Sequence, residues 1–241
     1  MQSPSSQNFI PQITIECVIF GYENKRLKVL ISKLDFKGDF WVLPGGFVSQ
    51  EDDIDVAAYK ILQLRTGIEN IFLEQFRIFG KAERNNTSFI NKLVELNLEI
   101  HQSNTKKQED YKWLTKRFIG LGYYALVDIN KVIPRKSDID QSMAWYDISN
   151  IPQMILDHNE CVNEALKVLR RDIDEKLTAF NLLPETFTMK EVQELYETIF
   201  GKTFERANFQ KKILELNILE RLEKKFTGAQ NKAPYLYRFM K

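Results

Sequence analysis

The chain has 241 residues, of which 44% are hydrophobic and 28% charged, and its formal net charge is +1. This balance excludes wholesale disorder, and the length suits two unequal domains. No run of about 18 apolar residues occurs that could span a membrane as a helix. The polar segment 1–9 lacks the basic and apolar regions of a secretory signal, and the only cysteines are Cys17 and Cys161. We therefore expect a cytoplasmic protein without a disulfide bond.

The N-terminal third is predicted to combine strands with one helix. Segments rich in β-branched and apolar residues predict strands at 12–20, 27–32 and 41–43. The third strand runs into the breaker cluster 44–46, which we expect to form a sharp turn. Helical periodicity follows over 52–66, and Gly67 is expected to end that helix.

The middle of the chain is predicted to hold further strands around an insertion. Strands are expected at 76–81, 118–129 and 144–148, and a polar, uneven stretch from 84 to 115 separates the first two. Within this insertion, 90–100 fits a helix and a strand equally well.

A long helical pattern follows the last of these strands. We expect Pro152 to open it, because proline is tolerated in a first helical turn, and the pattern continues to Ile173. It breaks near 180–184, where we place the domain boundary.

The segment from Gly46 to Ile68 has the length and frame of the Nudix signature, in which glycines bound a loop and a helix. The final glycine falls at Gly67, and WVLP with Gly45 and Gly46 precedes the loop. This resemblance covers roughly 12–170. It implies a Nudix-like α/β/α sandwich with a mixed sheet, whose closing helix would correspond to 151–160.

The residues that carry chemistry in that signature are replaced here. In Nudix hydrolases, glutamates on one helix face hold divalent cations that polarise a diphosphate. The family's arginine and helix glutamates correspond here to Lys60, Ile61, Leu64 and Arg65. The loop acid survives as Asp52, which also suits simple complementarity to a helix dipole. We therefore expect no catalytic residue, no metal site and no cofactor, so that the chain is not an enzyme.

The C-terminal segment is predicted to be a winged helix-turn-helix. Thr188 and Glu191 have capping-box spacing for a helix that ends near Gly201. A second helix is expected at 206–217, followed by a hairpin of strands at 219–226 and 235–239. From Lys202 onward there are ten basic and four acidic residues, an excess of six positive charges that leaves −5 on the remainder. Such asymmetry favours nucleic acid as a partner.

The second helix of this architecture enters the DNA major groove, and the wing lies against phosphates. Side chains at the start of that helix are expected to read bases, and basic residues along it and on the wing to hold the backbone. The candidate DNA-binding residues are Arg206, Asn208, Gln210, Lys211, Lys212, Lys224, Lys225 and Lys232.

The pairing of a degenerate Nudix domain with a winged helix resembles the Nudix-related transcriptional regulators. The most specific stretches are FTMKEVQELYETIFGKTFERANFQKKIL and the ending YLYRF, and the whole resemblance is nearest to the L-arabinose utilisation branch. It implies an effector-binding domain at 10–180 and a DNA-binding domain at 184–241. We expect a homodimeric repressor of sugar utilisation genes that releases operator DNA when a sugar such as L-arabinose binds. The alternatives are an ADP-ribose-sensing regulator of NAD metabolism and a Nudix pyrophosphohydrolase.

The effector pocket is predicted from Nudix topology, which should bring several segments together beside the glycine turn. Its candidate residues are Glu16, Lys33, Trp41, Gly46, Phe47 and Arg77. His158 suits either a ligand contact or a buried, hydrogen-bonded packing role.

Overall fold

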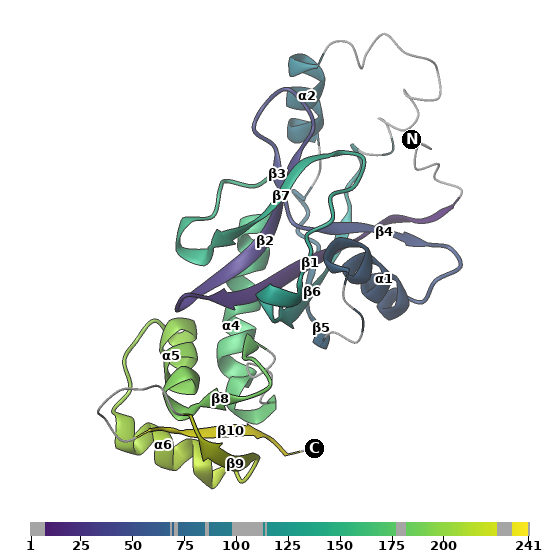
Figure 1. Ribbon diagram of the computed structural model, residues 1–241. Helices are drawn as coiled ribbons and strands as arrows, with labels where there is room; N and C mark the ends of the chain where they lie inside the picture. The colour runs from purple at the N-terminus through teal and green to yellow at the C-terminus, as the bar shows by residue number, and fades with distance from the viewer. Residues whose placement is uncertain are drawn as a thin grey trace.

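The computed structural model describes residues 8–67, 69, 72–84, 87–97, 113, 115–176, 182–225 and 233–240. The N-terminal part is a mixed β-sheet with helix α1 on one face and helix α4 on the other, as Figure 1 shows. Its sheet strands are β1 (Phe9–Glu23), β2 (Arg26–Leu34), β3 (Trp41–Val42), β4 (Gly45–Ser49), β5 (Phe72–Phe79), β6 (Ile119–Val127) and β7 (Asp140–Asp147). Its helices are α1 (Ile54–Thr66), α2 (Thr87–Leu96) and α4 (His158–Lys176), with short 3₁₀ turns η2 (Ile129–Lys131) and η3 (Ile148–Asn150). The expected α/β/α sandwich is confirmed.

The central strand β1 shows why the sheet carries a helix on each face. Side chains along a strand point alternately to the two faces of the sheet, and β1 carries apolar side chains on both faces. Ile15, Cys17 and Ile19 pack with α1, whereas Val18 and Phe20 pack with α4. The strand pairs in parallel with β6 and antiparallel with β2 and β4, so it is buried on both sides.

The glycine cluster at 44–46 does not form the sharp turn that we expected. Gly45 and Gly46 begin strand β4, and among the described glycines a positive φ occurs at Gly38, Gly67 and Gly201. Glycine is needed at position 45 for another reason, since a Cβ there would clash with the carbonyl oxygen of Ile15. The cluster marks a close approach of two strands rather than a reversal of the chain.

Two helices differ from or add to the sequence analysis. Helix α2 covers 90–96 of the segment for which helix and strand fitted equally well, and 98–100 lie outside the described residues. Helix α4 begins at His158 and not at Pro152, because Leu156 has φ 52°, which a right-handed helix cannot contain. Asn159 holds the preceding loop through hydrogen bonds with Met154 N at 2.8 Å and Pro152 O at 2.9 Å.

The C-terminal part is a winged helix-turn-helix, as predicted. It comprises β8 (Phe187–Thr188), α5 (Met189–Phe200), α6 (Arg206–Glu215), β9 (Leu219–Lys224) and β10 (Tyr235–Phe239). The capping box of Thr188 and Glu191 is formed, and Gly201 ends α5 in the left-handed conformation. Strand β8 was not predicted, because its two residues carry no periodic signal, yet it pairs with β10.

One hydrophobic cluster runs through both parts of the protein. It contains Phe20 and Val29 of the sheet, Leu169 of α4, and Leu195 and Ile213 of the winged helix. Both cysteines are free and buried. Among the described residues, no helix is long and apolar enough to cross a membrane.

Candidate functional site

Helix α6 presents a polar surface because its apolar side chains are used to attach it to α5. Phe209 and Ile213 are buried against the core, and Phe209 packs on Tyr196 of α5 with ring centroids 5.2 Å apart. The predicted DNA-binding residues lie on the same helix: Arg206, Asn208, Lys211 and Lys212 are exposed and Gln210 is half-buried, and Arg206 and Gln210 line a groove beside α5. The structure therefore gathers these five side chains on one accessible helix.

The angle between α5 and α6 is fixed by hydrogen bonds across the connecting turn. Glu197 accepts from Phe204 N at 2.9 Å, and Gln193 donates to Phe204 O at 2.9 Å. Glu205 caps α6 by accepting from the amides of Ala207 and Asn208, and these bonds hold the pKa of its carboxyl below the ordinary value. The turn thus fixes the direction in which α6 leaves α5.

The wing is the hairpin of β9 and β10. The guanidinium of Arg221 lies 4.3 Å from the ring centre of Tyr235, and the ammonium of Lys224 lies 5.4 Å from it. Lys225 is 3.6 Å from Glu191 of α5. The candidate Lys232 lies outside the described residues.

Helix α1 holds the positions at which Nudix hydrolases carry metal ligands, and their surroundings do not fit magnesium. Ile61 packs under Gly46, where a Cβ would lie 3.1 Å from its Cδ1, and the Leu64 side chain faces solvent with 69% exposure. Arg65 forms an ion pair with the buried Asp140. Among the described residues, no group of three His, Cys, Asp or Glu side chains is arranged to hold a metal.

Asp52, the remaining acidic residue of the signature, is also in an ion pair. Lys60 occupies the arginine position and binds the Asp52 carboxylate at 2.5 Å. A magnesium ion would therefore meet one paired carboxylate, two aliphatic side chains and a guanidinium, none of which is a free oxygen ligand.

Glu16 is the most enclosed of the predicted effector residues. Its carboxylate is bound by Arg84 at 2.7 Å and by Thr14 Oγ1 at 2.8 Å, and Arg84 also binds Asp157 at 2.9 Å. Burial raises the pKa of Glu16, against the opposing effect of Arg84. The side chains of Arg84 and Glu16 are only 3% and 6% exposed, so this ion cluster is internal.

The other predicted effector residues fall into separate groups. Lys33 and Trp41 are paired across β2 and β3, and the ammonium lies 5.4 Å from the indole centre. Phe47 pairs with Thr14 across β4 and β1, which places it next to Glu16, and it packs against Trp113. Gly46 lies on the opposite face of the sheet, over Ile61.

Arg77 stands apart from the glycine turn, because it forms an ion pair with Glu164 of α4. The structure thus brings Glu16 beside Phe47 and Lys33 beside Trp41.

Two residues of the buried cluster escaped the sequence analysis, namely Arg84 and Asp157. A lone arginine at the edge of an insertion gives no periodic signal.

His158 has the packing role of the two that the sequence allowed. It is buried, Leu43 N donates to its Nδ1 at 3.0 Å, and burial lowers its pKa to about 3.

The two parts of the protein meet where the β1–β2 hairpin touches α5, in the lower half of Figure 1. Asn24 and Lys25 form the tip with φ values of 51° and 59°. Thr198 of α5 donates to the backbone oxygen of Lys25 at 3.2 Å. Behind the hairpin, Arg170 of α4 donates to the backbone oxygen of Ile199 at 2.6 Å.

Comparison with known proteins agrees with this architecture. Residues 179–239 match the family model of the NrtR DNA-binding winged helix domain. The ADPR responsive transcriptional repressor NtrR of Acinetobacter baylyi is 24% identical over 236 residues, which cover 95% of this chain and 82% of that protein.

Two solved structures share the fold of the whole chain. Shewanella oneidensis NrtR, complexed with a 27mer DNA, has a TM-score of 0.72 at 20% identity, covering 95% of this chain and 94% of that one. A MutT/nudix family protein from Enterococcus faecalis has a TM-score of 0.68 at 15% identity, covering 96% and 87%.

The expected assignment to the L-arabinose branch is wrong. The matched domain model is of NrtR type, and the relative that spans nearly the whole chain is ADPR responsive. The most specific stretches behind that assignment lie in the winged helix, outside the Nudix-like domain in which we expect the effector, and therefore carry no information about the effector. The N-terminal part therefore has a Nudix-like fold, and it is followed by a winged helix in which residues 179–239 match the NrtR DNA-binding winged helix domain family.

Proposed function

We propose that this chain is a transcriptional repressor that binds operator DNA through its winged helix and releases it when ADP-ribose binds the Nudix-like domain. The observation that carries the proposal is helix α6, whose exposed side chains include Arg206, Asn208 and Lys211 within a segment that matches a DNA-binding domain family. The A. baylyi relative supports the effector, since it is an ADPR responsive repressor.

The proposed division of labour follows the chemistry of each surface. Arg206, Asn208 and Gln210 would contact base edges, while the lysines of α6 and the wing would contact phosphates. We assign the effector domain to 10–180 and the DNA-binding domain to 184–241. A homodimer would place two recognition helices on successive half-sites of an operator.

The proposed effector carries two phosphates and an aromatic base, and therefore needs cations and an aromatic surface. Lys33 over Trp41 supplies both in one pair. Glu16 and Phe47 lie on the same face of the sheet, so a ligand there would lie between α4 and the β4 strand. Arg77, which pairs with Glu164 of α4, would flank this site, whereas Gly46 faces Ile61 on the other side of the sheet and would not contact the ligand.

We further propose that the chain does not hydrolyse ADP-ribose. Ile61 and Leu64 offer no oxygen to a cation, and Arg65 is held by Asp140. Magnesium-dependent turnover of about 1 per second or faster would contradict this.

The decisive experiment is a titration of the full chain with fluorescent duplexes selected from a random pool. ADP-ribose is expected to weaken DNA binding, and the same duplex must weaken ADP-ribose binding by the same factor. Arg206→Ala should lose the selected duplex and keep ADP-ribose binding in calorimetry. Equal DNA affinity with and without saturating ADP-ribose would overturn the proposed regulation.

A further inference from the structure

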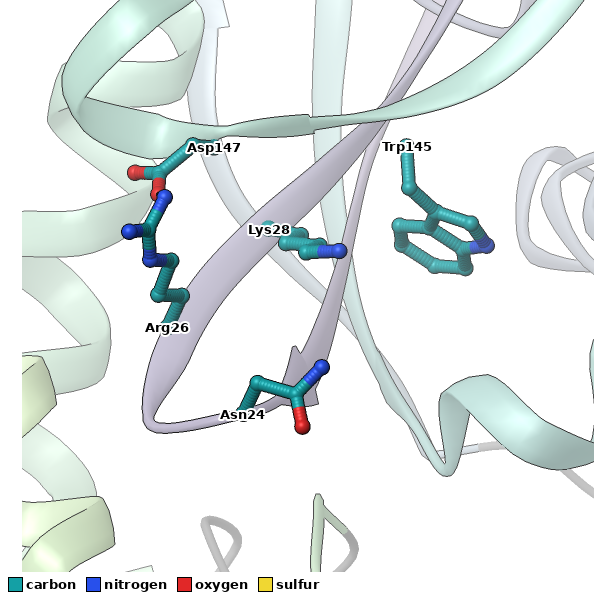
Figure 2. A pocket seen from close by; sticks show the side chains of 5 residues that line it. All are labelled: Asn24, Arg26, Lys28, Trp145 and Asp147. Carbon is teal, nitrogen blue, oxygen red and sulfur yellow. The ribbon is translucent and has the colours of Figure 1, made fainter.

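A pocket of about 440 Å³ lies at the β1–β2 hairpin, lined by Asn24, Arg26, Lys28, Trp145 and Asp147 (Figure 2). This volume falls within the range of about 300–1,000 Å³ that small-molecule sites occupy. The pocket is separate from the candidate effector residues. Trp145 pairs with Leu30, which belongs to the core under α1, whereas Trp41 packs on Tyr146 at the α4 face.

The indole of Trp145 forms a rigid wall of this pocket. A Cβ at Gly21 would lie 3.0 Å from two ring atoms of Trp145, so the ring packs closely against strand β1. The ring is half-buried, which leaves part of it facing the pocket. A fixed, partly exposed indole is suited to stacking with a planar ring of a ligand.

The polar lining consists mainly of donors. Asn24 extends its amide from the hairpin turn, and Figure 2 shows the Lys28 ammonium pointing toward the space before Trp145. Arg26 is 3.3 Å from Asp147, and Lys28 is 2.6 Å from Glu23. Arg26 is 69% exposed and Glu23 is 40% exposed, whereas Asp147 and Lys28 are 23% and 22% exposed. Each ion pair is therefore partly screened by solvent, and a phosphate can compete for its cation.

Asp147 is the single carboxylate of the lining, and it is already occupied. Ser149 donates to it through its backbone amide at 3.0 Å and its hydroxyl at 2.7 Å. These hydrogen bonds, with Arg26, lower the pKa of Asp147. Arg26 and Lys28 are thus paired with two carboxylates, Asp147 and Glu23. A phosphate can take both cations, because Asp147 keeps its hydrogen bonds with Ser149 and the half-exposed Glu23 can turn to solvent.

We propose that this pocket binds a free mononucleotide, with its base against Trp145 and its phosphate on Lys28 and Arg26. Lys25 stands between two lining residues and pairs with Glu194 of α5. A nucleotide in the pocket therefore acts on the contact between the hairpin and the winged helix. Binding itself does not depend on the proposed function.

The test uses the full chain with AMP as the probe, measured by calorimetry and by tryptophan fluorescence. Lys28→Gln is expected to weaken AMP binding about tenfold or more, which corresponds to about 1.4 kcal/mol. The matched control is Lys167→Gln, which removes an exposed lysine of α4 that pairs with Glu164 and should leave AMP binding unchanged. Trp145→Phe should keep binding in calorimetry while losing the fluorescence change.

Competition separates this site from the effector site. With ADP-ribose saturating, AMP is expected to bind with unchanged stoichiometry, and this result stands whether or not ADP-ribose affects DNA binding. Displacement of AMP by ADP-ribose would overturn the proposal. So would the absence of AMP binding up to millimolar concentration, equal losses in Lys28→Gln and Lys167→Gln, or binding of a short single-stranded oligonucleotide but not of AMP.

Discussion

Lys25, at the tip of the β1–β2 hairpin, forms an ion pair with Glu194 of α5 in which Nζ lies 2.9 Å from Oε1. The pair joins a loop of the Nudix-like sheet to the helix that supports the recognition helix α6. Since β2 also carries the candidate effector residue Lys33, the hairpin would connect the two proposed functions of the chain.

The first prediction concerns this connection. Lys25→Ala should reduce the effect of ADP-ribose on DNA affinity by up to about fivefold, because an exposed ion pair contributes about 0.2–1 kcal/mol. Anisotropy titrations with and without ADP-ribose measure it. Lys190→Ala is the matched control, since Lys190 lies 3.8 Å from the same glutamate but belongs to α5 itself. If both variants changed the ADP-ribose effect equally, the hairpin would have no special role.

The second prediction concerns the buried ion cluster. Arg84→Met leaves the Glu16 carboxylate without its cation and should destabilise the protein by about 3–5 kcal/mol at pH 7. Urea unfolding measures this. Adding Glu16→Gln should recover much of the loss, because a neutral amide needs no counter-charge. Lys81→Ala is the control, since it removes only an exposed pair with Glu160 and should change stability little.

The pH dependence of the stability of Arg84→Met follows from the direction in which the pKa of Glu16 is shifted. Burial already raises the pKa of Glu16 in the folded protein, and loss of Arg84 should raise it further. The folded variant then holds a proton that the unfolded chain releases, so its stability falls as pH rises. The stability difference between the variant and the wild type should therefore shrink from pH 7 to pH 5. A constant difference would show that charge is not the cause.

The third prediction concerns acid unfolding. His158 has a pKa of about 3 when folded, against 6.5 for the free side chain. Its neutral form contributes stability that is fully present above pH 6.5 and is lost as pH falls toward 3, at up to about 1.4 kcal/mol per pH unit. His158→Gln keeps an acceptor for Leu43 N and cannot be protonated. Its unfolding free energy should fall less steeply between pH 6.5 and 4.5, and an unchanged slope would contradict the assignment.

The fourth prediction separates phosphate contacts from base contacts. Lys224→Ala should weaken binding to selected and scrambled duplexes alike and lower the salt slope by about 0.9. Arg206→Ala should cost about 1–3 kcal/mol on the selected duplex and little on the scrambled one. Salt titrations on both duplexes measure the two effects, and Lys167→Ala on α4 is the control. The reverse pattern would mean that the domain docks on DNA in another orientation.

Local features of the sequence determined where helices end and which side chains α1 carries at the metal-ligand positions of the Nudix signature. The capping box of Thr188 and Glu191 and the stops at Gly67 and Gly201 were readable because each acts within about one helical turn. The replacement of metal ligands by Ile61 and Leu64 could also be predicted from the sequence, because an aliphatic side chain offers no oxygen to a cation wherever it lies. The resemblance supplied the two-domain architecture, and it misled on the effector.

Tertiary structure decided the features that join distant residues. Glu16 and Arg84 are 68 positions apart, and Arg26 and Asp147, which line the hairpin pocket, are 121 apart. Strand β4 exists because Gly45 approaches β1 closely, and helix α4 starts late because Leu156 has a positive φ. No local pattern encodes such features, because the free energy that selects them comes from burial and pairing between elements that meet only when the sheet has formed.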